Sequence, residues 1–344
     1  MFLPTDSKRA SAVLLWLILP FFLTACSRPP EPLALGGQTM GTYWTVLLHS
    51  PPEPLDVAEL EGQITQLLDK LNDEVSTYRS DSLISQFNRA PAGTVIALPA
   101  GFASVLKEAL FWAQATDGAF DPTAGPLTNL WGFGPERGKQ TPPAADLIDA
   151  ALKRVGWERL PFQESTGSLR QPGDVYLDLS AIAKGWGVDR VADHLGEAGM
   201  ENFLVDIGGE IRVAGSRPDN TGWRVGIERP AADQREAITM LEMKDLAIAT
   251  SGSYRNFFEA GEQSYSHLID PRTGQPVTHS TVSVTVAADS ATAADALATA
   301  LSIMPIEEAV QFASGRDIAV FWLLVDGEVL RERMTPAFER LINQ

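Results

Sequence analysis

Hydrophobic residues recur along this chain with two different periods, which together predict a mixture of helices and strands. Apolar residues three and four positions apart predict helices, and short apolar runs bounded by Gly, Pro and Asp predict strands. The strands follow one another in hairpin-like runs with helices between them, so we expect an α+β fold with largely antiparallel sheets flanked by helices. The predicted helices cover 55–75, 80–88, 102–116, 144–155, 181–198, 291–304 and 306–313, and the predicted strands cover 43–49, 175–179, 203–213, 223–228, 237–243, 246–250, 264–269, 281–287 and 318–325.

The N-terminus resembles a bacterial lipoprotein signal. Lys8 and Arg9 precede an apolar run at 12–23, which Pro20 interrupts and which is too short to cross a bilayer as a helix. Small residues then lead to Cys26, the one cysteine of the chain, where we expect cleavage and attachment of a lipid such as palmitate. An ordinary signal peptide with an incidental cysteine is the alternative.

This pattern divides the chain into three parts. The globular part is long enough for one large domain or two intertwined lobes, and we expect two lobes. A lipid on Cys26 would hold it at the periplasmic side of a bacterial membrane, inner or outer. The expected parts are a signal peptide at 1–25, a Pro- and Gly-rich tether without periodicity at 26–38, and the functional domain at 39–344.

The composition is that of an ordinary globular protein with a strongly acidic balance. Hydrophobic residues make up 44% of the chain and charged residues 21%, and the formal net charge is −17. Such a surface repels nucleic acid, so we expect no nucleic-acid partner, and an anionic ligand would need a local cation or a metal in order to bind. With Cys26 lipidated, no thiol is left for a disulfide, a nucleophile or a thiolate metal site.

One of the four histidines, His267, stands at the end of a strand-like run and just before a Pro-Arg-Thr-Gly turn at 271–274. Histidine can take or give a proton near neutral pH, and a turn rich in Pro and Gly fixes the backbone beside it. A reactive side chain held by a rigid turn is typical of a catalytic or binding site. A structural hairpin with a half-buried histidine fits this segment equally well.

A carboxylate, a hydroxyl and a lysine surround the start of one predicted helix. Asp178 ends a predicted strand, Ser180 can cap the helix that follows, and Lys184 lies in its first turn. The helix dipole disfavours a cation there, so Lys184 indicates an anion held between the lysine and free backbone N–H groups. Gly185 and Gly187 each cost a helix ~1 kcal/mol, and two departures from local preference favour a functional site over a structural role.

Asp295 and Thr299 are four positions apart on the predicted helix over 291–304, so their oxygens lie on one stripe. Most neighbouring residues are alanines, which leave room above the helix. Carboxylate, hydroxyl and backbone carbonyl oxygens suit a hard cation such as Mg²⁺. A plain polar stripe is the alternative.

Three further motifs carry weaker signals. Met40, beside a glycine, offers a soft surface for a planar ring, or else belongs to an ordinary loop before a strand. Tyr78 follows a predicted helix and can stack on an aromatic ligand or cover the core. Asp121 precedes Pro122 in a long aromatic loop at 118–135, and its carboxylate either meets a heterocycle or forms a turn within the loop.

These motifs together resemble the ApbE family, whose members are FAD:protein FMN transferases with a T-fold-like architecture. The resemblance runs from about residue 36 to residue 335, and the lipoprotein signal that precedes this range fits the family too. It rests on seven motifs in order: 39–42 (TMGT), 76–78 (STY), 118–123 (GAFDPT), 178–185 (DLSAIAKG), 206–210 (DIGGE), 267–274 (HLIDPRTG) and 295–299 (DALAT).

The resemblance also implies roles for individual residues. Asp295 and Thr299, with the Ala181 carbonyl, would hold the catalytic Mg²⁺, and Lys184 would face a phosphate or the flavin end. A threonine hydroxyl is a poor nucleophile unless a base accepts its proton, and our hypothesis is that His267 is this base. The alternative role for His267 is a contact with the flavin. Contacts to FAD are implied for Met40, Tyr78, Ala119, Phe120, Asp121 and Asp178.

The implied reaction transfers FMN from FAD to a threonine or serine hydroxyl of a target protein and releases AMP. Mg²⁺ would neutralise the charge that builds up on the pyrophosphate. The implied acceptors are membrane subunits of sodium-pumping NADH:quinone reductases or related electron-transfer complexes. An Mg²⁺-dependent FAD pyrophosphatase and a non-catalytic periplasmic flavin-binding lipoprotein are the alternatives, and the histidine and the metal pair favour catalysis.

Overall fold

The computed structural model describes residues 31–136, 141–229, 236–252, 256–261, 263–327 and 329–343. The expected signal peptide and the lipidation site Cys26 lie outside these residues. From residue 31 onward the chain is one compact unit, so the two expected lobes are not separate bodies. No helix in the described part is long and apolar enough to cross a membrane.

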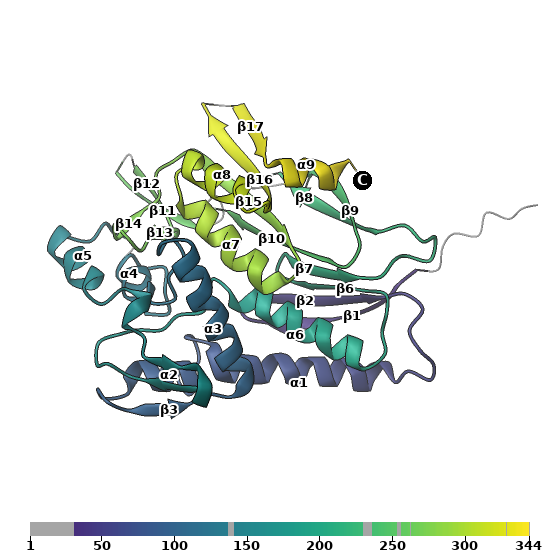
Figure 1. The fold of residues 1–344 in the computed structure, drawn as a ribbon, viewed down its shortest axis with the longest axis horizontal. Helices are drawn as coiled ribbons and strands as arrows, with labels where there is room; N and C mark the ends of the chain where they lie inside the picture. The colour runs from purple at the N-terminus through teal and green to yellow at the C-terminus, as the bar shows by residue number, and fades with distance from the viewer. Residues whose placement is uncertain are drawn as a thin grey trace, which may run out of the picture. The chain divides into compact units, whose positions relative to one another are not determined.

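The described strands form one large sheet and four small ones. The strands are β1 (Leu33–Thr39), β2 (Thr42–Leu48), β3 (Val95–Ala97), β4 (Phe162–Gln163), β5 (Ser168–Arg170), β6 (Phe203–Ile207), β7 (Glu210–Ala214), β8 (Trp223–Glu228), β9 (Ala237–Met243), β10 (Leu246–Gly252), β11 (Phe257–Ala260), β12 (Gln263–Ser266), β13 (Ile269–Asp270), β14 (Gln275–Pro276), β15 (Thr281–Ala288), β16 (Ala319–Asp326) and β17 (Val329–Met334). The large sheet has the order β1-β2-β6-β7-β10-β15-β16-β17 (Figure 1). Every neighbouring pair in it is antiparallel, which confirms the predicted fold class.

Helices pack against both faces of this sheet. All seven predicted helices are present, with ends shifted by up to three residues. The helices are α1 (Val57–Val75), α2 (Leu83–Arg89), α3 (Ala100–Ala115), α4 (Gly125–Leu130), α5 (Ala145–Leu152), α6 (Ala183–Glu197), α7 (Ala291–Ile303), α8 (Ile306–Ser314) and α9 (Pro336–Ile342).

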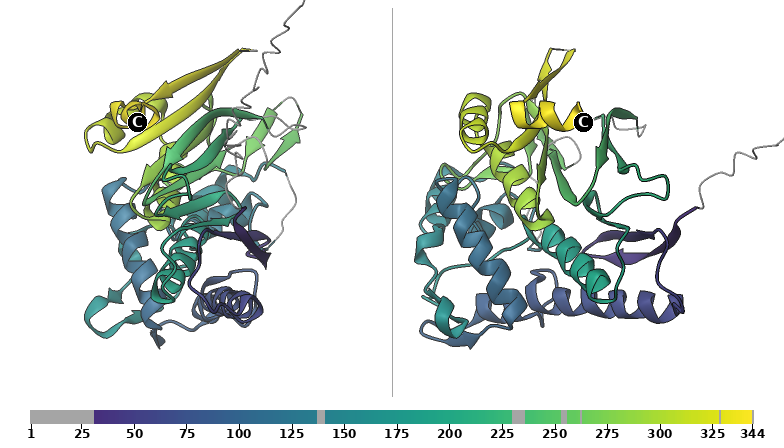
Figure 2. Two further views of the ribbon diagram at one scale, coloured as in Figure 1. Left: turned by 90° about the vertical axis from the view of Figure 1, so that its right-hand side faces the viewer. Right: turned by 45° about the vertical axis from the view of Figure 1, so that its right-hand side comes forward.

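Apolar clusters lie on both faces of the large sheet. Successive residues of a strand point to opposite faces. On β7, Glu210 and Arg212 reach α6, whereas Ile211 and Val213 pack into a separate apolar cluster with β8, β9 and α9. Helices α6 and α7 therefore lie on one face, with α1 and α3 packed outside them, and the β8–β9 hairpin and α9 lie on the other (Figures 1 and 2).

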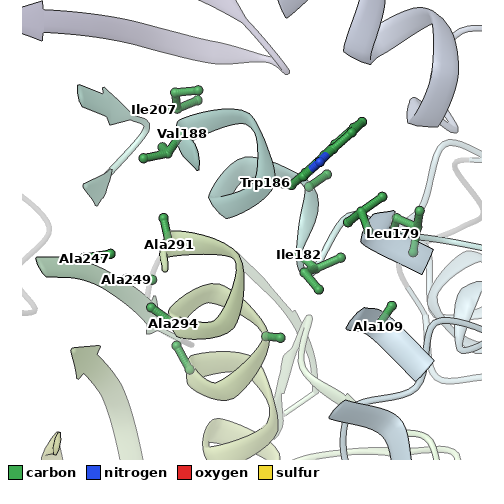
Figure 3. Close-up of a cluster of buried hydrophobic side chains, with 14 of the residues drawn as sticks. Ala109, Leu179, Ile182, Trp186, Val188, Ile207, Ala247, Ala249, Ala291 and Ala294 are labelled. Carbon is green, nitrogen blue, oxygen red and sulfur yellow. The ribbon is translucent and has the colours of Figure 1, made fainter. Parts of the chain in front are cut away.

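Helices α6 and α7 approach each other very closely near their N-terminal ends. Figure 3 shows the small side chains of Ala291 and Ala294 on α7, which lie against Ala247 and Ala249 of β10. Gly185 of α6 comes closer still, since a Cβ built on it would be 2.2 Å from the Ala291 carbonyl oxygen. The close packing of the two helices therefore requires a glycine at this position. The sequence pattern had instead indicated a functional site at this unfavourable helical glycine.

Each of these two helices supplies a carboxylate to the N-terminus of the other. Asp295 Oδ2 on α7 accepts a hydrogen bond of 2.9 Å from the Gly185 N–H on α6. Asp189 on α6 accepts bonds from the N–H groups of Ala291 (3.0 Å) and Thr292 (2.8 Å) on α7. A carboxylate at a helix N-terminus bonds free N–H groups and complements the helix dipole, so the exchange stabilises both helices and fixes their spacing.

The tether predicted over 26–38 was wrong from Leu33 onward. These residues form β1, which pairs along its whole length with β2. The glycines that suggested a flexible linker are needed for packing, because a Cβ on Gly37 would lie 2.6 Å from the Trp44 indole nitrogen. The globular domain therefore begins several residues earlier than predicted.

The strand predicted over 175–179 is also absent. No described strand pairs with this segment. The Leu177 N–H instead donates to the side-chain oxygen Oδ1 of Asn88 at 2.7 Å. The loop predicted over 118–135 contains the short helix α4. The segment 175–179 takes its conformation from a partner that is distant in the sequence, which local periodicity does not indicate.

Replacing Gly185 with alanine should destabilise the domain, because the added methyl group would collide with the backbone of α7. We expect Gly185→Ala to lower the free energy of unfolding in urea by about 1–3 kcal/mol, the usual cost of overpacking. Gly196→Ala is the matched control on the same helix, since nothing lies within 4 Å of its Cβ position. Alanine there should stabilise the helix by up to ~1 kcal/mol. Equal stability of the two variants would contradict the close approach of α6 and α7.

Candidate active site

A cavity of about 590 Å³ lies at one end of the large sheet. It forms where the β6–β7 turn, the last residues of β10, the start of α6 and one side of α7 meet. Its volume is within the range of small-molecule and cofactor sites. Nine of the predicted site residues line it: Ala119, Phe120, Asp121, Asp178, Ala181, Lys184, His267, Asp295 and Thr299.

The wall formed by α6 and α7 presents oxygen atoms that suit a hard cation. In a continuous helix the Gly185 N–H would bond the Ala181 carbonyl, but it bonds Asp295 Oδ2 instead. No hydrogen bond to that carbonyl is found in the described chain. Asp295 and the Thr299 hydroxyl, which is 3.4 Å from Ser251 Oγ, supply the other oxygen atoms of this wall.

These mixed oxygen donors fit Mg²⁺, whose preferred ligands are carboxylate and other oxygens. No group of three or more His, Cys, Asp or Glu side chains among the described residues could hold a metal ion. A cation at this wall would therefore depend on the backbone carbonyl of Ala181 and the hydroxyl of Thr299 as well as on Asp295.

The cavity is strongly acidic. Lys184 is the one Lys or Arg among its described lining residues, and it forms an ion pair with Glu210, which is 2% exposed. Burial raises the pKa of Glu210, and the ammonium group of Lys184 opposes the rise. A dianionic ligand would thus meet net negative charge unless a cation accompanies it. The lining carboxylates are Asp121, Asp178, Asp206, Glu228 and Asp295.

Lys184 is charged in this setting. Burial alone would lower its pKa, but the carboxylates of Glu210 and Asp295 raise the pKa of Lys184 above its usual value. Burial also raises the pKa of Asp295, and Lys184 opposes that rise. The lysine therefore compensates two buried acidic groups at once.

His267 has a defined tautomer at the cavity. Its Nδ1 lies 2.9 Å from the Asn256 carbonyl oxygen, which can only accept, so Nδ1 carries the proton and Nε2 has a lone pair. Burial lowers the pKa of His267 below 6.5, the Asn256 bond opposes this, and the charge of Lys184 adds to it. The imidazole is therefore neutral at pH 7 and able to accept a proton at Nε2.

The sequence predicted a rigid turn after His267, and in the structure Arg272 holds this turn through two carboxylates. Arg272 donates from Nε and Nη2 to the two carboxylate oxygens of Asp270, at 3.0 and 2.9 Å, and from Nη1 to Glu308 at 3.1 Å. Gly274 has a φ of 71°, in the left-handed region that favours glycine. The backbone behind the histidine is thus fixed by an ion-pair network and a tight turn.

Asp121 and Asp178 line the cavity but also bond their own loops. Asp121 Oδ1 accepts from the Thr123 N–H at 2.7 Å and its Oδ2 from the Trp157 N–H at 3.1 Å, so the turn alternative applies to this residue. Asp178 Oδ1 accepts from the Ser180 N–H at 2.9 Å and from its hydroxyl at 2.6 Å. The expectation that Ser180 caps α6 was therefore wrong, and the capping carboxylate comes from α7.

Met40 and Tyr78 are not among the described residues that line the cavity. Met40 lies in the β1–β2 turn with a φ of 49°. Its methyl carbon packs on α6, since it would be 3.2 Å from a Cβ on Gly187. Tyr78 follows α1 and is 66% exposed. Contacts of these two residues with FAD stay predictions.

Several wall residues were not singled out from the sequence. The turn at 208–209, the end of β10 at 250–251 and Tyr43 all line the cavity. Glu210, the partner of Lys184, belongs to the DIGGE motif that entered the family resemblance without a role. The motif was the available signal, but the ion pair depends on β7 lying under α6, which local patterns do not reveal.

Comparison with known proteins agrees with this geometry. A model described as the ApbE family matches residues 40–322 of the chain. This chain belongs to the ApbE family. A Vibrio cholerae O1 relative named FAD:protein FMN transferase is 41% identical over 94% of this chain and 96% of its own length. An Escherichia coli K12 relative with the same name is 32% identical over 95% of this chain and 96% of its own length.

Solved ApbE structures have the same fold. The flavin transferase ApbE from Vibrio cholerae superposes with a TM-score of 0.83 at 40% identity, covering 91% of this chain and 100% of that one. The apo form of the Pseudomonas stutzeri flavinyl transferase ApbE gives a TM-score of 0.84 at 35% identity, covering 91% and 98%. The family resemblance and the fold class expected from the sequence are both confirmed.

The neutral, Nδ1-protonated form of His267 can be observed by ¹⁵N NMR of labelled protein. We expect a protonated Nδ1 and a bare Nε2 at pH 7, and a titration midpoint below 6.5, because burial disfavours the imidazolium form. The spectrum of a His267→Gln variant identifies the signals. A midpoint above 6.5, or a proton on Nε2, would show that the ring is held differently.

Proposed function

We propose that this chain is an Mg²⁺-dependent FAD:protein FMN transferase, which moves FMN from FAD to a threonine or serine hydroxyl of a target protein and releases AMP. Membership of the ApbE family and the names of its relatives support the transfer reaction. The observation that carries the proposal is the meeting, in one cavity, of Lys184, a neutral His267 and the oxygens of Ala181, Asp295 and Thr299.

The acidic cavity can accept FAD only if the charge of its pyrophosphate is neutralised. Held by Ala181, Asp295 and Thr299, Mg²⁺ would supply that charge and polarise the phosphoryl oxygens. Lys184 adds a second cation on the same wall, and its N–H groups that do not bond Glu210 can donate to phosphate oxygens. The lysine would thus orient the pyrophosphate and stabilise the charge that develops as the phosphoanhydride bond breaks.

His267 would accept the proton in this reaction. The acceptor hydroxyl donates its proton to Nε2, its oxygen forms the new bond to the FMN phosphorus, and the bond from that phosphorus to the bridging oxygen breaks, so that AMP leaves. The bond from Nδ1–H to Asn256 keeps the ring in the tautomer that this step needs. The Asp270–Arg272 pair keeps the backbone behind it in place.

The acceptors that we propose are membrane subunits of electron-transfer complexes, such as sodium-pumping NADH:quinone reductases. A lipid on Cys26 would anchor the enzyme at the periplasmic side of the membrane, close to such subunits. The lipoprotein-like pattern at 1–25 supports the anchor, and the acidic composition argues against a nucleic-acid partner.

Asp295→Asn should remove metal-dependent cleavage of FAD and leave the fold intact. The amide oxygen can still accept the Gly185 N–H bond, whereas the charge that attracts Mg²⁺ is lost. We expect the rate of FMN and AMP release, measured by chromatography at saturating FAD, to fall on the order of 10²-fold.

Asp189→Asn is the matched control for this variant, because Asp189 caps α7 in the same way but does not line the cavity. It should lower the stability of the protein and leave the rate per folded molecule unchanged. Equal losses of activity in the two variants would mean that the carboxylate at position 295 acts only through the fold.

His267→Gln should slow the transfer of FMN without weakening the binding of FAD. With FAD, Mg²⁺ and a peptide that contains a target threonine, we expect covalent flavin fluorescence on the peptide, formed about 10²–10⁴-fold more slowly by the variant. For the unchanged protein, kcat/KM should fall as the pH decreases through a midpoint below 6.5, because a protonated imidazole cannot accept a proton. The variant should lack this decrease.

Two other results of the same experiment would change the proposal. Free FMN and AMP without labelled peptide would favour a pyrophosphatase. A transfer rate in His267→Gln equal to that of the unchanged protein would exclude the histidine as the base.

A further inference from the structure

Two ion pairs of opposite polarity connect β7 to α6. Glu210 of β7 pairs with Lys184 of α6, and two positions further along β7 Arg212 pairs with Asp189 at 2.8 Å. The second pair has a structural use, because Asp189 also caps α7. The first pair caps nothing, and Glu210 Oε2 is buried without a hydrogen-bond partner. A buried carboxylate that is only partly bonded is costly, which points to a functional reason for its presence.

The motif at 206–210 (DIGGE) forms the turn that places Glu210. Gly208 and Gly209 take φ values of 62° and 103° in the β6–β7 turn, and Asp206 Oδ1 accepts the Gly209 N–H at 2.8 Å. Glu210 follows directly, paired in register with Ile207. A tight, internally bonded turn therefore fixes the carboxylate of Glu210 behind the cavity wall.

Lys184 lies between two carboxylates. Its ammonium group is paired with Glu210 and is also attracted by Asp295, which bonds the backbone of the next residue, Gly185. A lysine side chain is flexible and carries a compact charge, so without Glu210 it would be free to move onto Asp295. There it would neutralise the one charged donor of the proposed Mg²⁺ set.

We propose that Glu210 is a positioning residue that holds Lys184 away from Asp295, so that the lysine and the metal ion occupy separate places on the cavity wall. This inference rests on the proposed function through its Mg²⁺ site. The pyrophosphate then meets two cations, one from the protein and one bound beside it. Without Glu210 the lysine would compete with the metal for the same carboxylate.

Binding of Mn²⁺, measured by electron paramagnetic resonance without FAD, tests this role independently of activity. Mn²⁺ takes the same carboxylate and carbonyl ligands as Mg²⁺. We expect Glu210→Gln, which keeps the size of the side chain, to raise the Kd for Mn²⁺ about 10-fold or more. In a Lys184→Met background no lysine is present to compete, so the same change should have an effect about 10-fold smaller.

The double-mutant cycle separates this role from a direct attraction of the metal by Glu210. If the charge of Glu210 simply attracts the cation, Glu210→Gln will weaken Mn²⁺ binding equally in both backgrounds, and the inference is overturned. The same holds if Glu210→Gln has no effect. Arg212→Met breaks the other ion pair between β7 and α6 and should leave the Kd for Mn²⁺ unchanged.

Thermal unfolding of each variant shows whether the protein that is titrated is folded. Should Glu210→Gln fail to fold, Glu210→Met replaces it in the same cycle, since an apolar residue of similar volume is often tolerated in place of a buried charge. If the unchanged protein binds no Mn²⁺, the Mg²⁺ site of the proposed function fails and this inference fails with it. If it binds Mn²⁺ and the cycle shows no coupling, only the inference is overturned.

Discussion

The exchange of carboxylates between α6 and α7 is the interaction on which the rest of the site depends. Asp295 caps α6 across 110 positions of sequence, and Asp189 caps α7 in return. Because Asp295 takes the Gly185 N–H, the Ala181 carbonyl is left for another partner. The carboxylate of Asp295 thus bonds the start of α6, and the same residue lines the cavity. Gly185 makes this arrangement possible, since any side chain there would separate the two helices.

The acidic charge of the chain explains much of the remaining site. A net charge of −17 and a cavity lined by carboxylates repel a phosphate ligand, so every cation at the wall is important. Lys184 compensates Glu210 and Asp295, and its positive charge also helps to keep His267 neutral. The neutral state of His267 and the positive charge of Lys184 are therefore coupled electrostatically. In such a site a bound Mg²⁺ would both offset the negative charge of the pyrophosphate and polarise its phosphoryl oxygens.

Long elements with a clear period were predictable, and short or unusual ones were not. The helices α1, α3, α6 and α7 and most strands of the large sheet follow their hydrophobic patterns. Strand β1 was missed because its two glycines, which make room for Trp44, look like those of a linker. The segment 175–179 was predicted as a strand because it is apolar, yet its backbone bonds the Asn88 side chain instead of a neighbouring strand. In each case a contact from a distant segment overrides the local preference.

The sequence by itself determined the family, the order of the main elements and nine of the residue types that line the cavity, because periodicity and motifs are local properties of the chain. Only the tertiary structure decided which polar atoms are free to act. In the structure one oxygen of Asp295 accepts a hydrogen bond from α6, and the Nδ1–H of His267 donates to the Asn256 carbonyl. Lys184 forms an ion pair with Glu210. The physical reason is that a hydrogen bond or ion pair depends on the distance between groups that the fold, and not the order of residues, brings together.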